Sequence, residues 1–241
     1  MTGKTHKQGG LLISIIGFAM LRHYNLLYSN ISLFTQWLVM YPFCVWGSMA
    51  SDLDHHWMSC PQKDYVSWII NKVLHITAPI QKGIEKAGGK KDLSYKVVKL
   101  LNASHRSWQT HSDLTLFIMI WLIYELINKK FSIFNELDII ILSIVLTGVA
   151  LGIIAHLFLD ILTPEGIWLI GFVIINRVLD KKILPEKLHI VPHMKFFATG
   201  QDWEKFIQKV LRIATGVSLV WFLITIFIPN WMSYIHFEFS F

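Results

Sequence analysis

Eight His and Asp side chains, spread over more than half of the chain, lie beside the ends of strongly apolar segments. Imidazole and carboxylate groups together form a ligand set for zinc and neighbouring divalent metals. If the apolar segments cross a bilayer in sequence order, all eight groups reach the same membrane face. The pattern therefore predicts a metal site assembled from several helix ends, with ligands His6, Asp52, Asp54, His55, His105, His111, His156 and Asp160.

The run Asp52-Leu53-Asp54-His55 follows an apolar segment that ends at Ala50. The C-terminal end of a helix carries partial negative charge, so two carboxylates there are electrostatically unfavourable. A polar helix end that only marks the membrane boundary is the alternative reading. We favour a metal site, because the two carboxylates and the imidazole emerge together where the helix meets water.

His156 and Asp160 lie four residues apart in an apolar segment, and therefore on one face of the predicted helix. Ionisable groups inside membrane helices are rare and usually functional, although a hydrogen-bonded structural pair is the alternative. His105 and His111 precede another apolar segment, and their spacing allows a shared metal, but two His residues in a polar loop are common. His6 is a candidate ligand only because it is predicted to lie on the same membrane face as the others.

The composition indicates that these groups belong to an integral membrane protein. Hydrophobic residues make up 54% of the 241 residues, charged residues only 16%, and the mean hydropathy is +0.48. About 20 mostly apolar residues are needed to span a bilayer as a helix. Five segments qualify as candidates: Gly9–Leu27, Leu33–Ala50, Leu114–Ile127, Ile139–Leu159 and Ile213–Pro229.

These segments predict an all-α, polytopic membrane protein with about five membrane-embedded helices and amphipathic cytoplasmic helices. The first is interrupted by Arg22 and His23 and the third is short, so each could instead be tilted or interfacial. Ile167–Ile175 is too short to cross and predicts a re-entrant or surface-lying segment. We expect one domain over residues 1–241, with cytoplasmic elaborations at residues 62–102 and 166–210.

The Lys and Arg residues predict the orientation, because they accumulate in short cytoplasmic loops. With five spans and a cytoplasmic N-terminus, nineteen of the 22 fall on the cytoplasmic side. All eight predicted ligands then lie at the cytoplasmic face of the plasma membrane. The net charge of +6 is explained by anionic lipid beside this basic face, so no nucleic-acid partner is expected.

Residues 62–102 contain apolar side chains at helical spacing with polar residues between them, which predicts a helix lying on the membrane surface. The apolar residues are Tyr65, Ile69, Ile70, Val73 and Leu74, and the polar ones are Lys63, Asp64, Asn71 and Lys72. A solvated basic helix with a core-facing apolar stripe is an equally weighted alternative.

Several motifs carry a family resemblance. They are Thr5-His6 before an apolar helix, Asp52-Leu53-Asp54-His55, His-Arg-x-x-x-Thr-His-Ser at 105–112, His-x-x-x-Asp-x-x-Thr-Pro-x-Gly at 156–166 and Thr199-Gly200-x-x-x-Glu204. In order and in most spacings, they resemble the YdjM family of membrane-bound metal-dependent hydrolases. Two departures are Ala50-Ser51 in place of the usual Leu-Pro, and an extra residue between His105 and His111.

The resemblance implies a metal-dependent hydrolase. The family is more remotely similar to zinc-dependent phospholipases C, which implies one to three ions, zinc or manganese, and phosphoester hydrolysis by a metal-activated water. Asp54 or Glu204 is the candidate base, and Arg106 could bind a phosphate oxygen. Membrane lipid is the expected partner, and a lipid or lipid-linked phosphoester is the expected substrate. We expect the membrane to be a bacterial plasma membrane.

Two other functions fit parts of the pattern. A non-catalytic membrane protein could hold a structural or transported metal, with a regulatory or partner-docking role. Transport predicts ligands at mid-bilayer depth, whereas these lie at span ends. An intramembrane metalloprotease would be expected to carry His-Glu-x-x-His on a helix, and the sequence has no such run.

Overall fold

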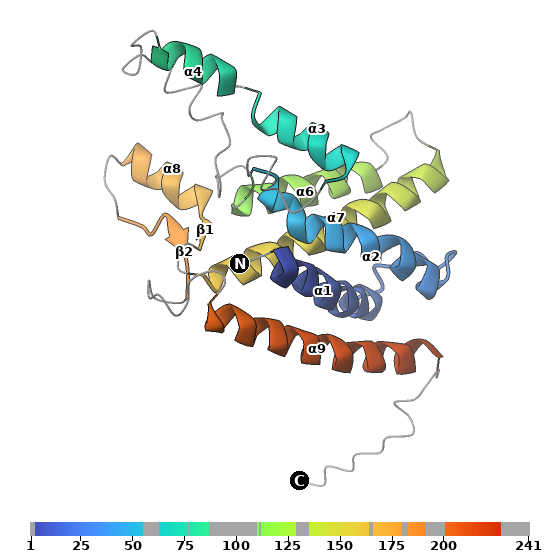
Figure 1. Cartoon of the computed structure of the whole chain (residues 1–241). Helices are drawn as coiled ribbons and strands as arrows, with labels where there is room; N and C mark the ends of the chain where they lie inside the picture. The colour runs from blue at the N-terminus through green and yellow to red at the C-terminus, as the bar shows by residue number, and fades with distance from the viewer. Residues whose placement is uncertain are drawn as a thin grey trace.

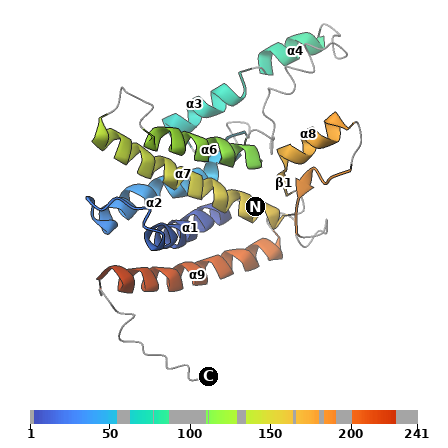
Figure 2. The ribbon, with the colours of Figure 1, turned by 180° about the vertical axis from the view of Figure 1, so that it is seen from behind.

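A computed structural model of the chain describes residues 3–54, 63–76, 78–86, 110, 112–128, 135–163, 166–179, 183–190 and 201–227. Within them the protein is mostly helical, as predicted. Five long helices run side by side (Figures 1 and 2): α1 (Gly3–His23), α2 (Leu33–Ala50), α6 (Asp113–Ile127), α7 (Glu136–Ile161) and α9 (Asp202–Phe227). Helix α7 contacts α1, α2 and α6, while α9 packs against α1.

Short elements connect and flank these helices. The 3₁₀ helix η1 (Ser51–Asp54) continues α2, and α3 (Tyr65–Leu74) and α4 (Ala78–Lys86) follow it. After α7 come β1 (Ile167–Trp168), α8 (Ile170–Val178) and β2 (Lys187–Leu188). Helices α3 and α4 lie at the edge of the bundle opposite α9 (Figure 1).

Each of the five predicted apolar segments coincides largely with one long helix, although Gly9–Leu27 continues past the end of α1 at His23 and Ile213–Pro229 continues past the end of α9 at Phe227. Among the described residues, two stretches are long and apolar enough to cross a membrane, Glu136–Ile161 of α7 and Asp202–Ile224 of α9. Helix α9 begins eleven residues before the predicted segment at Ile213. The prediction did not include these residues because the first turns of the helix are polar. This extension brings Glu204 into the helix, at the end nearest the predicted ligands.

Helices α2 and α7 approach each other closely through glycines. A Cβ atom on Gly47 would lie 2.5 Å from the carbonyl oxygen of Val149, and one on Gly148 would lie 2.5 Å from that of Met40. Both distances are far below van der Waals contact. Small residues at such interfaces let membrane helices pack backbone to backbone. This packing fixes α7 against the end of α2, where the predicted ligands emerge.

The core of the bundle lies between α1, α2, α7 and α9, around Ile15, Phe18, Met40, Ile144 and Phe222. The outer surfaces of α6 and α9 are also apolar, with exposed residues such as Phe117, Trp121 and Val217. In a soluble protein these surfaces would face water unfavourably. Their apolar character agrees with a membrane location.

One feature departs from the all-α prediction. Strands β1 and β2 form a two-residue antiparallel ladder that pairs Ile167 with Leu188 and Trp168 with Lys187. The predicted short segment Ile167–Ile175 is therefore divided between β1 and α8. Two-residue strands are too short to show the alternating pattern by which a strand is recognised in a sequence.

Candidate metal centre

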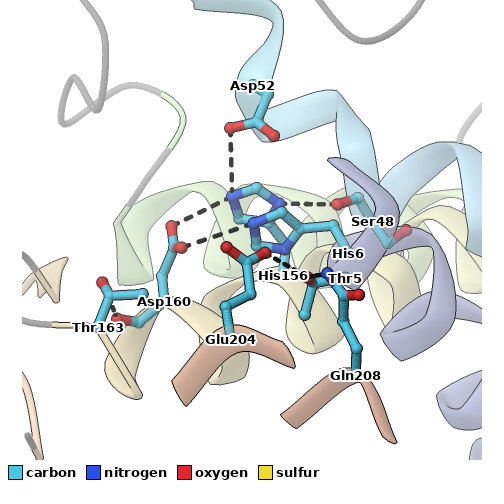
Figure 3. A network of polar contacts seen from close by, with 9 residues as sticks. All are labelled: Thr5, His6, Ser48, Asp52, His156, Asp160, Thr163, Glu204 and Gln208. Atoms are coloured by element: carbon cyan, nitrogen blue, oxygen red, sulfur yellow. Dashed lines mark hydrogen bonds and ion pairs between the residues drawn. The ribbon is translucent and has the colours of Figure 1, made fainter. Parts of the chain in front are cut away.

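The candidate centre lies where the start of α1, the end of α7 and η1 meet (Figure 3). It contains His6 of α1, Asp52 of η1, and His156 and Asp160 of α7. His6, His156 and Asp160 are at most 1% exposed, and Asp52 is 7% exposed. Burying so many ionisable groups together is costly unless they are paired or bind a cation.

His156 is oriented by a hydrogen bond to the backbone. Its Nδ1 atom lies 2.7 Å from the Ser48 carbonyl oxygen. Because a carbonyl only accepts hydrogen bonds, Nδ1 carries the proton and donates it. Nε2 then faces two carboxylates, at 3.2 Å from Oδ2 of Asp160 and 3.9 Å from Oδ1 of Asp52. An imidazole held in this way is the usual arrangement of a metal-ligating histidine.

His6 stacks on His156, with ring centroids 3.8 Å apart and an interplanar angle of 15°. Its Nε2 atom lies 3.7 Å from Oδ1 of Asp160, so this carboxylate faces both imidazoles. His6 precedes the predicted span that begins at Gly9. In its neutral form, this imidazole offers a lone pair to a metal.

The geometry suits a divalent cation. His6, Asp52 and His156 each offer one ligand atom, and these three atoms all lie within 4.8 Å of one another. Asp160 adds a carboxylate beside both imidazoles. Two imidazoles and two carboxylates match the nitrogen and oxygen ligands of zinc and of manganese. The donor set therefore fits a divalent metal ion.

Helix α9 contributes a second group of polar side chains next to this cluster. Thr5 Oγ1 donates a hydrogen bond to Oε1 of Glu204. Gln208 Nε2 donates to the same Thr5 oxygen over 2.9 Å. Glu204 is 2% exposed, and Figure 3 shows its carboxylate beside the stacked imidazoles. Thr5 thus holds a buried carboxylate close to the candidate metal ligands.

The structure brings together four of the predicted ligands, and it places the predicted base Glu204 beside them. The backbone of Asp54 lies in η1, but its side chain is outside the described part of the structure. Four further predicted site residues also fall outside the described residues: His55, His105, Arg106 and His111. Their place in the site stays a prediction.

Three contributors to the site were not predicted as site residues: Thr5, which appeared only in the family motif, Ser48 and Gln208. Ser48 orients His156 through its backbone carbonyl, which a residue of any type could supply, so the sequence contained no signal for it. Gln208 lies four residues after Glu204, and therefore on the same face of α9. The i, i+4 spacing was the available signal, but it gains meaning only once Glu204 is known to face the site.

Comparison with known proteins gives one family match. Residues 1–171 match the family described as YdjM inner membrane protein. The matched region contains His6, Asp52, His156 and Asp160, whereas Glu204 lies beyond it. No curated protein and no solved structure matches the chain.

Proposed function

Because this chain belongs to the YdjM inner membrane protein family, we propose that it is a multi-pass membrane hydrolase whose buried His and Asp cluster binds a divalent metal. The proposed reaction is cleavage of a phosphoester, in a lipid or lipid-linked substrate, at the cytoplasmic membrane surface. The observation that carries the proposal is the convergence of His6, Asp52 and His156 from three separate elements.

The electrostatics of the cluster support a bound cation. Nδ1 of His156 is committed to the Ser48 carbonyl, so a neutral ring directs the lone pair of Nε2 toward Asp52 and Asp160. A lone pair facing two carboxylates is repelled unless a proton or a metal lies between them. His6 supplies a second imidazole at the same place, so the cluster offers two nitrogen donors as well as carboxylates to a metal.

When bound, a divalent metal supplies a Lewis acid that acidifies water and polarises a phosphoryl oxygen. His6, Asp52, His156 and Asp160 would hold it. Glu204 is the described carboxylate best placed to accept a proton from the attacking water, because Thr5 fixes it beside the ligands. Asp54 remains a second candidate for this role. Arg106 would bind the phosphoryl group.

The choice of a phosphoester rests on the remote resemblance to zinc-dependent phospholipases C and on the expected position of the ligands at the membrane surface. We propose five membrane helices, α1, α2, α6, α7 and α9, with the cluster on the cytoplasmic side. The positions of His6, near the start of α1, and of His156, near the end of α7, support a site at one end of the bundle.

The test is hydrolysis by the purified full-length protein, metal-stripped with a chelator and then restored with zinc or manganese. Release of phosphate or phosphorylated head groups is measured over a panel of lipid and lipid-linked substrates. Activity should disappear on stripping, return with metal, and be absent in His156→Ala. His23→Ala is the matched control, because His23 is exposed at the opposite end of α1. Activity that survives stripping and His156→Ala contradicts the proposal.

The near-complete burial of the cluster favours a second candidate, a non-catalytic membrane protein with a structural metal and a regulatory or docking role. A structural ion needs no access for substrate. This candidate predicts tightly bound metal, no hydrolysis of any substrate in the panel, and loss of thermal stability on stripping. The same purified protein distinguishes the two.

A further inference from the structure

Helix α3 turns its polar side toward the protein and its apolar side outward. Ser67 and Asn71 are at most 3% exposed, whereas Tyr65, Trp68 and Val73 are 74%, 40% and 60% exposed. A helix on the surface of a soluble protein has the reverse arrangement. The exposed side, which we call the outer face of α3, consists of Tyr65, Val66, Trp68, Ile69, Lys72 and Val73. This outer face requires apolar surroundings.

The charge and residue types of the outer face match an anionic lipid surface. Tyr65 and Trp68 stack on each other, and aromatic side chains of these types concentrate where a bilayer meets water. Lys72 lies over the Trp68 ring, with Nζ 5.9 Å from its centroid, and Lys63 precedes the helix. Both cations favour anionic lipid. Ten residues give a helix of about 15 Å, which is too short to cross the bilayer.

The buried side of α3 contacts the turn that carries a candidate ligand. Asn71 Nδ2 donates a hydrogen bond to the carbonyl oxygen of Leu53 over 2.5 Å. Leu53 directly follows Asp52, and it is 1% exposed. Ser67, on the same side of the helix, donates instead to the Asp64 carboxylate over 2.6 Å. Asn71 therefore joins α3 to η1 through a side-chain hydrogen bond.

We propose that the outer face of α3 lies in the lipid surface and that Asn71 uses this anchorage to fix η1, and with it Asp52. Asn71 is a positioning residue that acts on Asp52 without touching the metal. When α3 is seated in lipid, the Leu53 carbonyl is held and the Asp52 carboxylate stays close to His156. The lipid contact does not depend on the proposed function, whereas the effect on the metal rests on it.

The lipid contact is tested by spin labelling in vesicles of phosphatidylcholine and phosphatidylglycerol. A label is placed at Val73→Cys in a Cys60→Ser background, since Cys44 is fully buried. The reference is Ile213→Cys on α9, an exposed residue in a candidate membrane span. We expect both labels to collide with oxygen and to be shielded from a water-soluble nickel chelate. Access of the chelate at Val73 would show a water-facing helix, and shielding from both reagents would show a protein cover. Either result overturns the lipid contact.

The effect on the metal is tested with zinc alone. In the same vesicles Asn71→Ala should raise the zinc dissociation constant about tenfold or more, as loss of an outer partner of a ligand typically does. Ser67→Ala is the matched control on the same side of α3 and should leave it unchanged. Wild-type protein should bind zinc more tightly in anionic vesicles than in neutral detergent, and Asn71→Ala should lose this difference.

A second variant tests the same proposal without relying on the folding of Asn71→Ala. Val73→Asp changes only the outer face, and it should reduce the vesicle-to-detergent difference in zinc affinity while Asn71 is intact. Equal zinc affinity of wild type and Asn71→Ala overturns the positioning role. A wild-type protein that binds no zinc overturns the metal site and the positioning role together, whereas the labelling pattern still decides the lipid contact.

Discussion

At the scale of single residues, His156 shows how a metal site is prepared by the fold. Its Nδ1 proton is fixed on the Ser48 carbonyl, so the ring cannot turn Nε2 away from Asp160 without losing that bond. Hydrogen bonds to ligating imidazoles select the tautomer and the ring orientation. The ligand atoms of His6, Asp52 and His156 are thus grouped by the surrounding structure itself.

Replacing a metal ligand and replacing the proposed base should have different effects, which one experiment can distinguish. Asp52→Asn should lose most of the bound metal, because it removes a charged ligand. Glu204→Gln should keep the metal but lower the hydrolysis rate by about 10² to 10⁴, the usual contribution of general base catalysis. Metal analysis and phosphate release on the same samples measure both effects. Asp202→Asn is the control, since Asp202 is exposed and pairs only with Lys205 among the described residues. Loss of metal in Glu204→Gln would instead make Glu204 a ligand.

Residues that share one metal should also show strong coupling. His6→Ala and His156→Ala should each lower the metal content, and the double variant should lose little more than either alone, because one centre is already broken. Adding His111→Ala examines a predicted ligand outside the described residues. Additive losses, measured by metal titration, would mean separate sites.

The sequence predicted much of this centre because imidazole and carboxylate groups are rare in apolar segments. His156 and Asp160 stand out for that reason, and Asp52 stands out because it follows the end of an apolar segment, whereas His6 carried little weight on its own. The structure places His6 in ring contact with His156, a proximity that sequence separation conceals. Ser48 could not be predicted, because its contribution comes from the backbone.

At the scale of secondary-structure elements, the α2–α7 contact depends on the absence of side chains. Gly148→Ala should lower the free energy of unfolding by about 1–3 kcal/mol, because its Cβ would overlap the Met40 carbonyl and force the helices apart. Gly216→Ala on α9 is the matched control, because no atom of another described element lies within 4 Å of the new Cβ. It should be neutral or stabilising by up to about 1 kcal/mol. Thermal unfolding in detergent compares the two, and equal melting temperatures would contradict the close contact.

Hydropathy predicted the long helices because a membrane span needs a continuous apolar stretch. It could not predict where they begin when the first turns are polar. Helix α9 starts with Asp202 and Glu204, so its apolar segment was recognised only from Ile213. The β1–β2 ladder was missed for a different reason, since its pairing depends on residues about twenty positions apart.

At the scale of the whole molecule, the charge distribution predicts the orientation in the membrane. Because nineteen of the 22 Lys and Arg residues fall on one side in a five-span arrangement, residues 51–112 and 162–212 should be cytoplasmic. In intact cells, a membrane-impermeant thiol reagent should modify Ser240→Cys and spare Ser94→Cys, in a background without Cys60. Permeabilised cells, in which both should react, provide the control. The reverse pattern in intact cells would place the metal centre outside.

The polar cluster around the candidate centre draws on residues from position 5 to position 208 of a chain of 241. A ribosome that has delivered α7 has produced His6, Asp52, His156 and Asp160, but Glu204 is still to be translated. During synthesis, the nascent protein therefore passes through a stage in which these four ligand candidates are present and the α9 carboxylate is not. The order of the chain makes the synthesis of α9 the step that completes the cluster, so the full set of polar side chains exists only after α9 has been made.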